Sequence, residues 1–347
     1  MQKKKRMVGL DYFRITAALV TFLFHSVLHL GCNYGIMQEF LSMGAVVMTG
    51  FFILSGFSLF CVYKELRLME INNWKVYIKK RAIGIFPAYL VAGFAFMICI
   101  GSESILQNIV LLPVEVLGIQ ACFSSLFPIS HNGGTWFISC LLICYLVFPY
   151  ILEMVKQINI KMKICLILFA SAILLYSPIV VYYFGLNWTY TNPYFRGLEF
   201  LIGVVLASMM EDLLECKVIK KYLFSVIAIV MEAIIMVIGV SIAVKLDISF
   251  GNYMLYSWIC LPLFILMIPA LAQLDIKQGK IVAYASAISY DFFLVQFFVW
   301  PIVRKLKELV SMNNVVTIIV SLMICIGLSI VTHEVIEKPS KRLFRKG

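Results

Sequence analysis

Charged residues are scarce in this chain of 347 residues. Asp, Glu, Lys and Arg together make up 14% of it, whereas 62% of the residues are hydrophobic. This composition excludes a soluble domain. The apolar runs recur about every 25 to 40 residues, which predicts many membrane-spanning helices rather than one anchor. We therefore expect an all-α, polytopic helix bundle that forms a single integral-membrane domain over residues 1–347.

Several motifs of soluble enzymes are missing. The chain has no glycine-rich phosphate loop, no G-x-S-x-G elbow and no H-E-x-x-H motif, which excludes soluble hydrolases and nucleotide hydrolases of those types. The net charge of +11 would suit nucleic acid. However, the basic residues lie in short connections between apolar runs, with no extended basic patch and interleaved aromatics. Nucleic-acid binding is therefore excluded as well.

Cysteine is present but does not form metal-ligand patterns. Most of the ten cysteines lie inside apolar segments, where they behave as small hydrophobic residues. Cys140 and Cys144 are spaced for one helix face rather than for a metal clip, so we expect no metal. Cys32 and Cys122 lie in connections, and the sequence leaves a disulfide between them open.

The order of apolar runs predicts ten spans. Lys and Arg number 23 in one alternate set of connections and 4 in the other, which places both termini in the cytoplasm. The cluster Arg304, Lys305 and Lys307 runs against this count. The long outer connection 102–133 is apolar, so we expect it to lie against the bundle or re-enter it. The expected helices are 8–30, 40–63, 82–101, 134–152, 164–184, 194–210, 222–244, 253–271, 281–303 and 315–336.

The first apolar run, GLDYFRITAALVTFLFHS, carries Asp11, Arg14 and His25. Arg14 and His25 are eleven positions apart, so on a helix they lie within roughly 20° of one face and about 16 Å apart along the axis. Ionisable groups inside a membrane segment indicate a functional site by default. His25 is the best candidate for a general base or a nucleophile. The structural alternative is an Asp11–Arg14 ion pair with His25 as a satisfied core histidine.

Other polar residues each allow two interpretations. Lys80 and Arg81 precede an apolar run and either hold the phosphates of a soluble cofactor or act only as a topology signal. Arg196 and Glu199, one turn apart, form either a mutual ion pair or a polar wall for a hydroxylated substrate. Trp136 belongs to an aromatic belt or stacks on a sugar.

Seven segments together resemble the acyltransferase-3 family over essentially the whole chain. They are GLDYFRITAALVTFLFHS, FFILSGFSLF, YIKKRAIGIFPAYL, GTWFISCLLICYLVFPYI, RGLEFLIGVVLA, SYDFFLVQFF and IEKPSKRL.

The family consists of ten-helix proteins of the bacterial inner membrane. They transfer an acyl group, commonly acetyl, from cytoplasmic acyl-CoA to hydroxyls of cell-surface glycans or their lipid-linked precursors. Its most specific signature is a basic residue followed, after ten others, by a histidine, and Arg14 and His25 match it. The resemblance implies that the histidine is essential to transfer and that the arginine belongs to the donor-side site.

The chain departs from the family pattern at two positions. The family often has two arginines separated by two residues before the third helix; here Arg81 is kept and Gly84 occupies the second position. In the ninth helix, many relatives have a histidine where this chain has Gln296.

From the residues and the resemblance, we expect a membrane O-acyltransferase that uses acetyl-CoA as its donor. Arg81 and Lys80 would bind the donor phosphates, and Arg14 and His25 would act in transfer. The expected residues that contact the glycan acceptor are Trp136, Arg196 and Glu199. Membrane lipids surround the protein, and no oligomeric state is predicted.

Three alternatives remain open. The donor could be succinyl or another short acyl group. The chain could instead be a serine or small-molecule transporter like the membrane half of vancomycin-resistance serine racemases, or a scaffold with paired buried charges.

Overall fold

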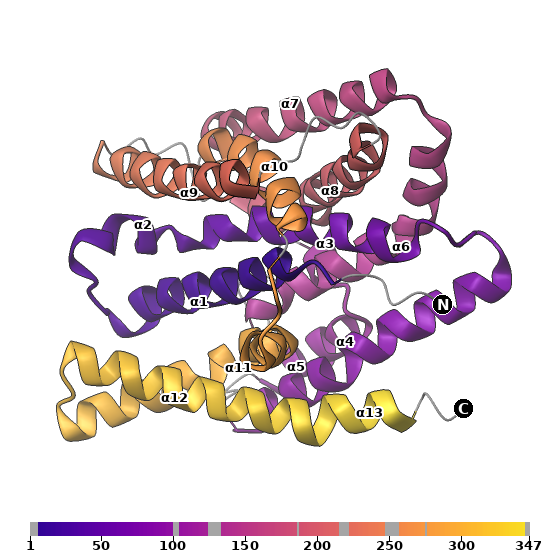
Figure 1. Ribbon diagram of the computed structural model, residues 1–347. Coiled ribbons are helices and arrows are strands. Elements are labelled where there is room, and N and C mark those ends of the chain that lie inside the picture. The colour runs from indigo at the N-terminus through magenta and orange to yellow at the C-terminus, as the bar shows by residue number, and fades with distance from the viewer. Residues whose placement is uncertain are drawn as a thin grey trace.

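The computed structural model describes residues 6–99, 104–123, 133–185, 187–214, 222–246, 257–274 and 276–343. All regular secondary structure within these ranges is helical. Nine of the described helices are long and apolar enough to cross a membrane. A helix satisfies its own backbone hydrogen bonds, which is what a spanning segment requires in lipid. The predicted all-α, polytopic bundle is therefore confirmed (Figure 1).

The α-helices follow one another along the chain with short connections. They are α1 Val8–Leu30, α2 Gln38–Ser42, α3 Val47–Tyr63, α4 Ile71–Cys99, α5 Ile105–Leu117, α6 Trp136–Gln157, α7 Ile160–Phe184, α8 Pro193–Leu214, α9 Tyr222–Lys245, α10 Ser257–Gln273, α11 Lys280–Val310, α12 Asn314–Thr332 and α13 Lys338–Leu343. A π-helical turn, His333–Glu337, joins α12 to α13.

Several of the expected boundaries differ by a few residues from those observed, and three of the differences matter most. α4 begins at Ile71, so the basic residues before the third span lie inside the helix and not in a loop. No proline or glycine separates Ile71 from this basic run, and lysine and arginine are good helix formers. α11 extends to Val310 and takes in the basic cluster at 304–307. α10 has only 17 residues and contains two prolines, and it is shorter than each of the nine candidate spans.

The first helix begins and the last one ends at the same end of the bundle (Figure 1). We call this the N-terminal end; the turns that follow α1 and α11 lie at the opposite end. The Lys and Arg count predicts that the N-terminal end faces the cytoplasm.

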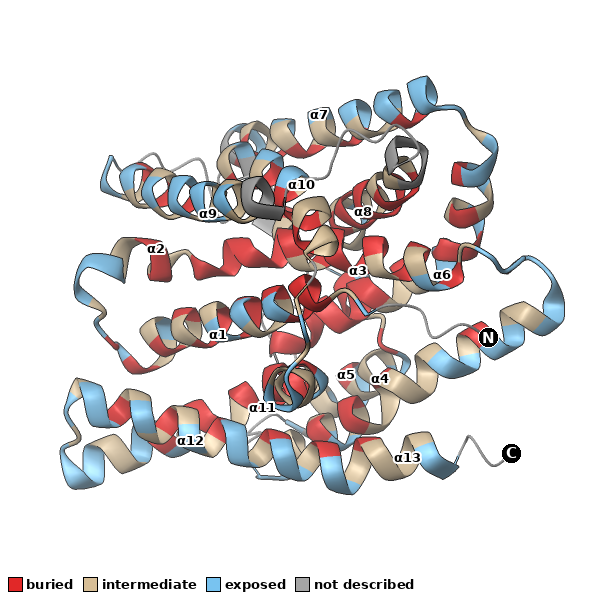
Figure 2. Ribbon diagram, viewed as in Figure 1, coloured by how far each residue is buried: buried red, intermediate tan, exposed pale blue. Residues whose placement is uncertain are grey.

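Helix α3 forms the centre of the bundle. In its membrane-spanning window 78% of the residues are buried, against 17% for α9 at the periphery. Figure 2 shows the buried residues gathered on α3 and on the faces turned toward it. Gly56 of α3 lies against the backbone of Phe200, and Gly203 of α8 lies against the backbone of Ile53. Small residues at such crossings let helix backbones approach closely in a membrane.

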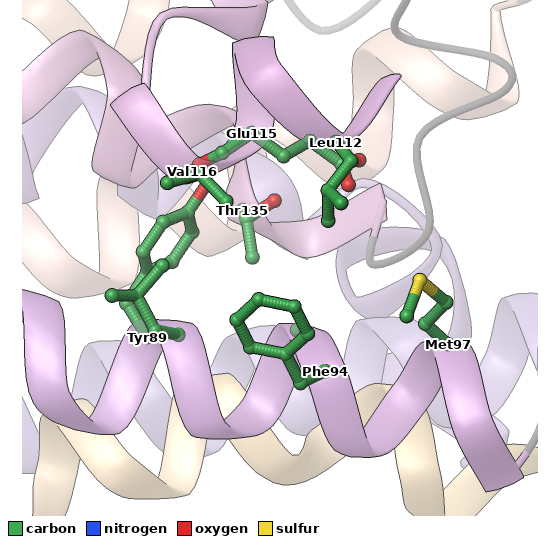
Figure 3. Close-up of a pocket in the computed structure, with 9 residues that line it drawn as sticks. Tyr89, Phe94, Met97, Leu112, Glu115, Val116 and Thr135 are labelled. Atoms are coloured by element: carbon green, nitrogen blue, oxygen red, sulfur yellow. The ribbon is translucent and has the colours of Figure 1, made fainter. Parts of the chain in front are cut away.

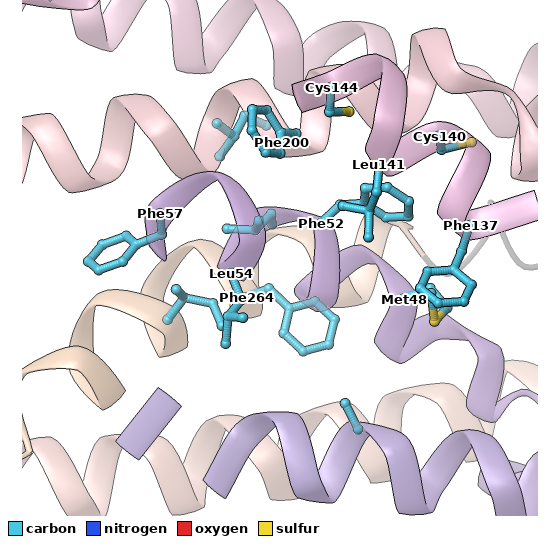
Figure 4. Packing of buried hydrophobic residues seen from close by; sticks show 14 of the residues in the cluster. Met48, Phe52, Leu54, Phe57, Phe137, Cys140, Leu141, Cys144, Phe200 and Phe264 are labelled. Atoms are coloured by element: carbon cyan, nitrogen blue, oxygen red, sulfur yellow. The ribbon is translucent and has the colours of Figure 1, made fainter. Parts of the chain in front are cut away.

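Large apolar side chains fill the remaining space around α3. Figure 4 shows Phe52, Leu54 and Phe57 of α3 between side chains of the neighbouring helices, among them Phe200 of α8 and Phe264 of α10. All five are almost fully buried. The core is therefore built across helices that are distant in the sequence.

The apolar connection between α4 and α6 packs on the bundle, as predicted, over its described part. The hydroxyl of Tyr89 in α4 donates to the carbonyl of Glu115 in α5, and the side chain of Gln120 is buried against Thr135. Between α4 and α5 a small hollow of about 30 Å³ remains, with Phe94 and Leu112 at its walls (Figure 3). A hollow of this size holds about one water molecule and no substrate. Residues 124–132, including His131, lie outside the described part.

Candidate active site

A cavity of about 490 Å³ lies among α1, α3, α4, α6 and α11, with α13 at its edge. One part of its wall is basic and the other is apolar, with Phe137 and Phe293 among the apolar residues. Ligand sites typically combine an apolar wall with a few convergent polar groups. This cavity is therefore the candidate active site.

Five cationic side chains line the basic part of the cavity: Arg6, Arg14, Lys80, Arg81 and Lys341. They come from the segment before α1 and from α1, α4 and α13. The described residues that line the cavity include no Asp or Glu. Arginine and lysine are the usual binders of phosphate, so these side chains are candidates for binding an anion.

Arg14 is held in place by a buried carboxylate. Its Nη1 donates to Oδ1 of Asp11 at 2.9 Å, and its Nη2 donates to the hydroxyl of Ser58 at 2.9 Å. Asp11 also accepts hydrogen bonds from Arg6 at 2.7 Å, from Gln278 at 2.8 Å and from Ser286 at 2.7 Å. The Asp11–Arg14 ion pair is thus present, and it also orients Arg14 at the cavity wall.

Arg81 is positioned by aromatic residues. Its Nη2 donates to the hydroxyl of Tyr63 at 3.0 Å, and its guanidinium lies 5.4 Å from the ring centre of Tyr63 and 5.8 Å from that of Tyr145. The Nε of Arg81 is buried without a hydrogen-bond partner. Gly84, one turn further along α4, also lines the cavity, and no atom lies within 4 Å of where its Cβ would stand. Glycine at this position therefore leaves room in the cavity, while Lys341 adds a cation from another helix.

His25 lies beyond the apolar part of the cavity. Its Nδ1 is 2.8 Å from Oε1 of Gln296 in α11. An amide oxygen only accepts hydrogen bonds, so this contact favours the neutral tautomer in which Nδ1 carries the hydrogen and Nε2 is unprotonated. Phe293 lines the cavity and also contacts His25, with ring centres 6.4 Å apart. Phe293 therefore borders both the cavity and the imidazole.

The three expected acceptor residues are brought together, but in a closed cluster. Arg196 is 1% exposed and donates to both carboxylate oxygens of Glu199 at 2.8 Å. It also donates to the carbonyl of Tyr190 at 2.7 Å and lies 5.6 Å from the ring centre of Trp136. Glu199 accepts a further bond from Thr49 at 2.8 Å. This geometry favours the ion-pair interpretation, and the acceptor role of these residues stays a prediction.

Three residues at the site were not assigned a role by sequence reasoning. Arg6 and Lys341 are near the chain ends, and only folding brings both to one cavity. The sequence shows Gln296 as a polar residue inside an apolar run, which indicates a buried polar contact. It does not show that the partner is His25, which is 271 positions away.

One described cluster has groups that could hold a metal ion: Asp291, His333 and Glu337, all buried. Nδ1 of His333 is 3.0 Å from Asp291 and also contacts Glu337. Glu337 pairs in turn with Lys341. Oδ1 of Asp291 is buried without a hydrogen-bond partner, and the expectation that the chain binds no metal stays a prediction. The described cysteines, Cys32 and Cys122 included, are free thiols.

The fold and the cavity define a polytopic membrane protein with a basic cavity, one wall residue of which, Phe293, contacts a buried histidine. The sequence profile of the acyltransferase-3 family, described as an acyltransferase domain, matches residues 7–334. The chain therefore belongs to this family and is a membrane acyltransferase. Comparisons with curated proteins and with solved structures found no match.

Proposed function

We propose that the chain transfers an acetyl group from acetyl-CoA to a hydroxyl of a cell-surface polysaccharide or a lipid-linked glycan. The donor binds from the cytoplasm and the acceptor lies on the outer side of a bacterial inner membrane. The observation that carries this proposal is the acid-free basic cavity whose apolar part ends at Phe293, against His25.

The charge distribution of the donor supports one orientation in the cavity. Coenzyme A carries its charge on phosphates at one end and a thioester at the other. The phosphates pair with Arg81, Lys80 and Lys341, and the uncharged arm passes Arg14 toward Phe293. The acetyl group then lies at the apolar wall, next to the ring that contacts His25.

The chemistry follows from the hydrogen bond between His25 and Gln296. With Nδ1 fixed as a donor, Nε2 takes the proton of the acceptor hydroxyl while the oxygen attacks the thioester carbonyl. A C–O bond forms, the C–S bond breaks, and the proton passes to the leaving thiolate. In a two-step route, Nε2 itself attacks the carbonyl, the C–S bond breaks and CoA leaves as the thiolate. The hydroxyl then attacks the acetyl-imidazole, the C–N bond breaks, and the hydroxyl proton passes to the thiolate.

The test uses purified protein in lipid nanodiscs with acetyl-CoA labelled in the acetyl group. We expect the wild type to release CoA and to label its acceptor. His25→Ala should bind CoA with unchanged affinity and lose at least a hundredfold in turnover, because general acid–base catalysis contributes about that much. Trapping an acetylated protein by mass spectrometry would distinguish the two-step route from the direct one.

The controls separate loss of chemistry from loss of fold. His25→Ala must elute as wild type on size exclusion and melt at a similar temperature. Full activity in this variant would overturn the proposal. Folded wild type that neither binds CoA nor releases it would favour the transporter alternative, and label from succinyl-CoA in preference to acetyl-CoA would change the donor.

A further inference from the structure

A second hollow, of about 400 Å³, lies at the opposite end of the bundle from the donor cavity. It is formed where α1 ends against the last turns of α11. Its lining residues are His29, Leu30, Arg304, Lys307, Glu308 and Ser311. We call it the outer pocket.

The outer pocket accounts for the exception in the charge distribution. Lys and Arg are nearly absent from the connections on this side, yet three of them occur within 304–307. Arg304 and Lys307 line the pocket, whereas Lys305 does not. The positive-inside rule does not explain why two cations lie on the side of the membrane that otherwise has few. We therefore look for a binding role.

Arg304 and Lys307 both donate hydrogen bonds to backbone carbonyls at the end of α1, and both have further N–H groups that could bind a ligand. Arg304 Nη2 donates to the carbonyl of His29 at 2.8 Å, and Lys307 Nζ donates to the carbonyl of Leu30 at 2.8 Å. These bonds satisfy two of the carbonyls that a helix C-terminus leaves without a partner. A guanidinium has five N–H donors and an ammonium has three. Most of the donors of this pair therefore remain for an anion in the pocket.

The outer pocket is one ring away from the candidate catalytic histidine. His29 lines the pocket, and its ring centre is 5.8 Å from that of His25. Trp300 stacks on His29 at 5.9 Å and holds its ring in place. The donor cavity approaches His25 from the other side, through Phe293. An acceptor bound in the outer pocket would thus reach His25 without crossing the donor.

We propose that the outer pocket binds a phosphate or diphosphate ester that forms part of the acceptor. Arg304 and Lys307 hold the phosphate oxygens, and the carboxylate of Glu308 accepts from hydroxyls of the attached sugar. This inference rests on the proposed function, because it names the chemistry of the acceptor: a sugar that is still joined to phosphate, rather than a finished neutral polysaccharide. The phosphate belongs to a lipid-linked sugar or to a soluble sugar phosphate.

The experiment measures binding of diphosphates to the full chain in nanodiscs by calorimetry, with CoA present at saturation so that the donor cavity is occupied. The probes are inorganic pyrophosphate, farnesyl diphosphate and uncharged farnesol. We expect both diphosphates to bind, with affinity that falls steeply with salt, and farnesol not to bind. Much tighter binding of farnesyl diphosphate assigns the phosphate to a lipid; equal affinities assign it to a soluble ester.

The variants test whether the outer pocket is responsible. Arg304→Gln with Lys307→Gln keeps N–H donors for the end of α1 and removes the charge, so it should fold and weaken diphosphate binding at least tenfold. Lys305→Gln removes the same charge from an adjacent position outside the pocket and should change nothing. Diphosphate binding that is absent, or equal in the double variant, would overturn the inference. These outcomes are independent of CoA release, so the failure of this proposal and of the proposed function remain distinguishable.

Discussion

Nδ1 of His25 and Oε1 of Gln296 lie 2.8 Å apart, although the two residues are separated by 271 positions. Gln296 is fully buried, and its Nε2 has no hydrogen-bond partner. The side-chain amide of Gln296 therefore acts on the imidazole of His25 only through Oε1, which accepts the hydrogen of Nδ1. A neutral partner selects the tautomer without adding charge to a membrane-embedded site.

Gln296→Leu removes this acceptor at similar volume. We expect turnover to fall roughly tenfold or more, because the ring then samples the wrong tautomer, while the KM for acetyl-CoA stays near the wild-type value. Gln296→Glu restores an acceptor oxygen and should recover part of the rate. Steady-state kinetics in nanodiscs measure both variants; an unchanged rate in Gln296→Leu would show that the contact is only structural.

Phe293 is expected to limit the size of the acyl group. Its ring lines the donor cavity, packs on Phe137 with ring centres 4.1 Å apart, and contacts His25. Phe293→Leu shortens this wall, so the preference for acetyl-CoA over butyryl-CoA should shift by about tenfold toward butyryl-CoA, the scale of a methylene-sized difference in an apolar pocket.

The neighbouring Phe292 provides the control for this prediction. It packs on Phe22 and lines a separate apolar groove. Phe292→Leu removes the same atoms away from the donor cavity and should leave the acyl preference unchanged. If both variants behaved alike, Phe293 would have no special place in selecting the acyl group.

Lys341 is expected to bind donor phosphate, held at the cavity by its pairing with Glu337. Lys341→Met should raise the Kd for CoA about tenfold at low salt, because a hydrogen bond to a charged group is lost. Arg342 stands next in the same helix, is exposed and does not line the cavity. Calorimetry should find CoA binding unaffected in Arg342→Met; equal effects in the two variants would indicate a general charge effect.

The close contact between α3 and α8 gives a prediction on stability. A Cβ at position 203 would overlap the carbonyl oxygen of Ile53, so Gly203→Ala forces the two helices apart. We expect a cost of about 1–3 kcal/mol in the free energy of unfolding and a lower melting temperature in detergent. Gly197, on the same helix, has no atom within 4 Å of where its Cβ would stand. Gly197→Ala should melt close to wild type, and a similar loss in both variants would contradict the argument.

The sequence by itself determined the features that depend on local periodicity and hydropathy. Apolar runs of sufficient length must become helices in a membrane, so the helix bundle could be predicted. Arg14 and His25 share a helix face because the helical repeat is a local property. The apolar connection between α4 and α6 was correctly expected to pack on the bundle, since an apolar segment does not remain in water. Even the exception at 304–307 was visible as a break in the charge pattern.

Only the tertiary structure decided which side chains meet. The contact of Gln296 with His25, and the presence of Lys341 in the same cavity as Arg14, depend on how α11 and α13 rotate against α1. The same packing closed Arg196 and Glu199 into a buried pair and placed Arg304 at the end of α1. Residue spacing within one helix carries no information on these rotations, because they result from side-chain packing between segments that are far apart in the chain.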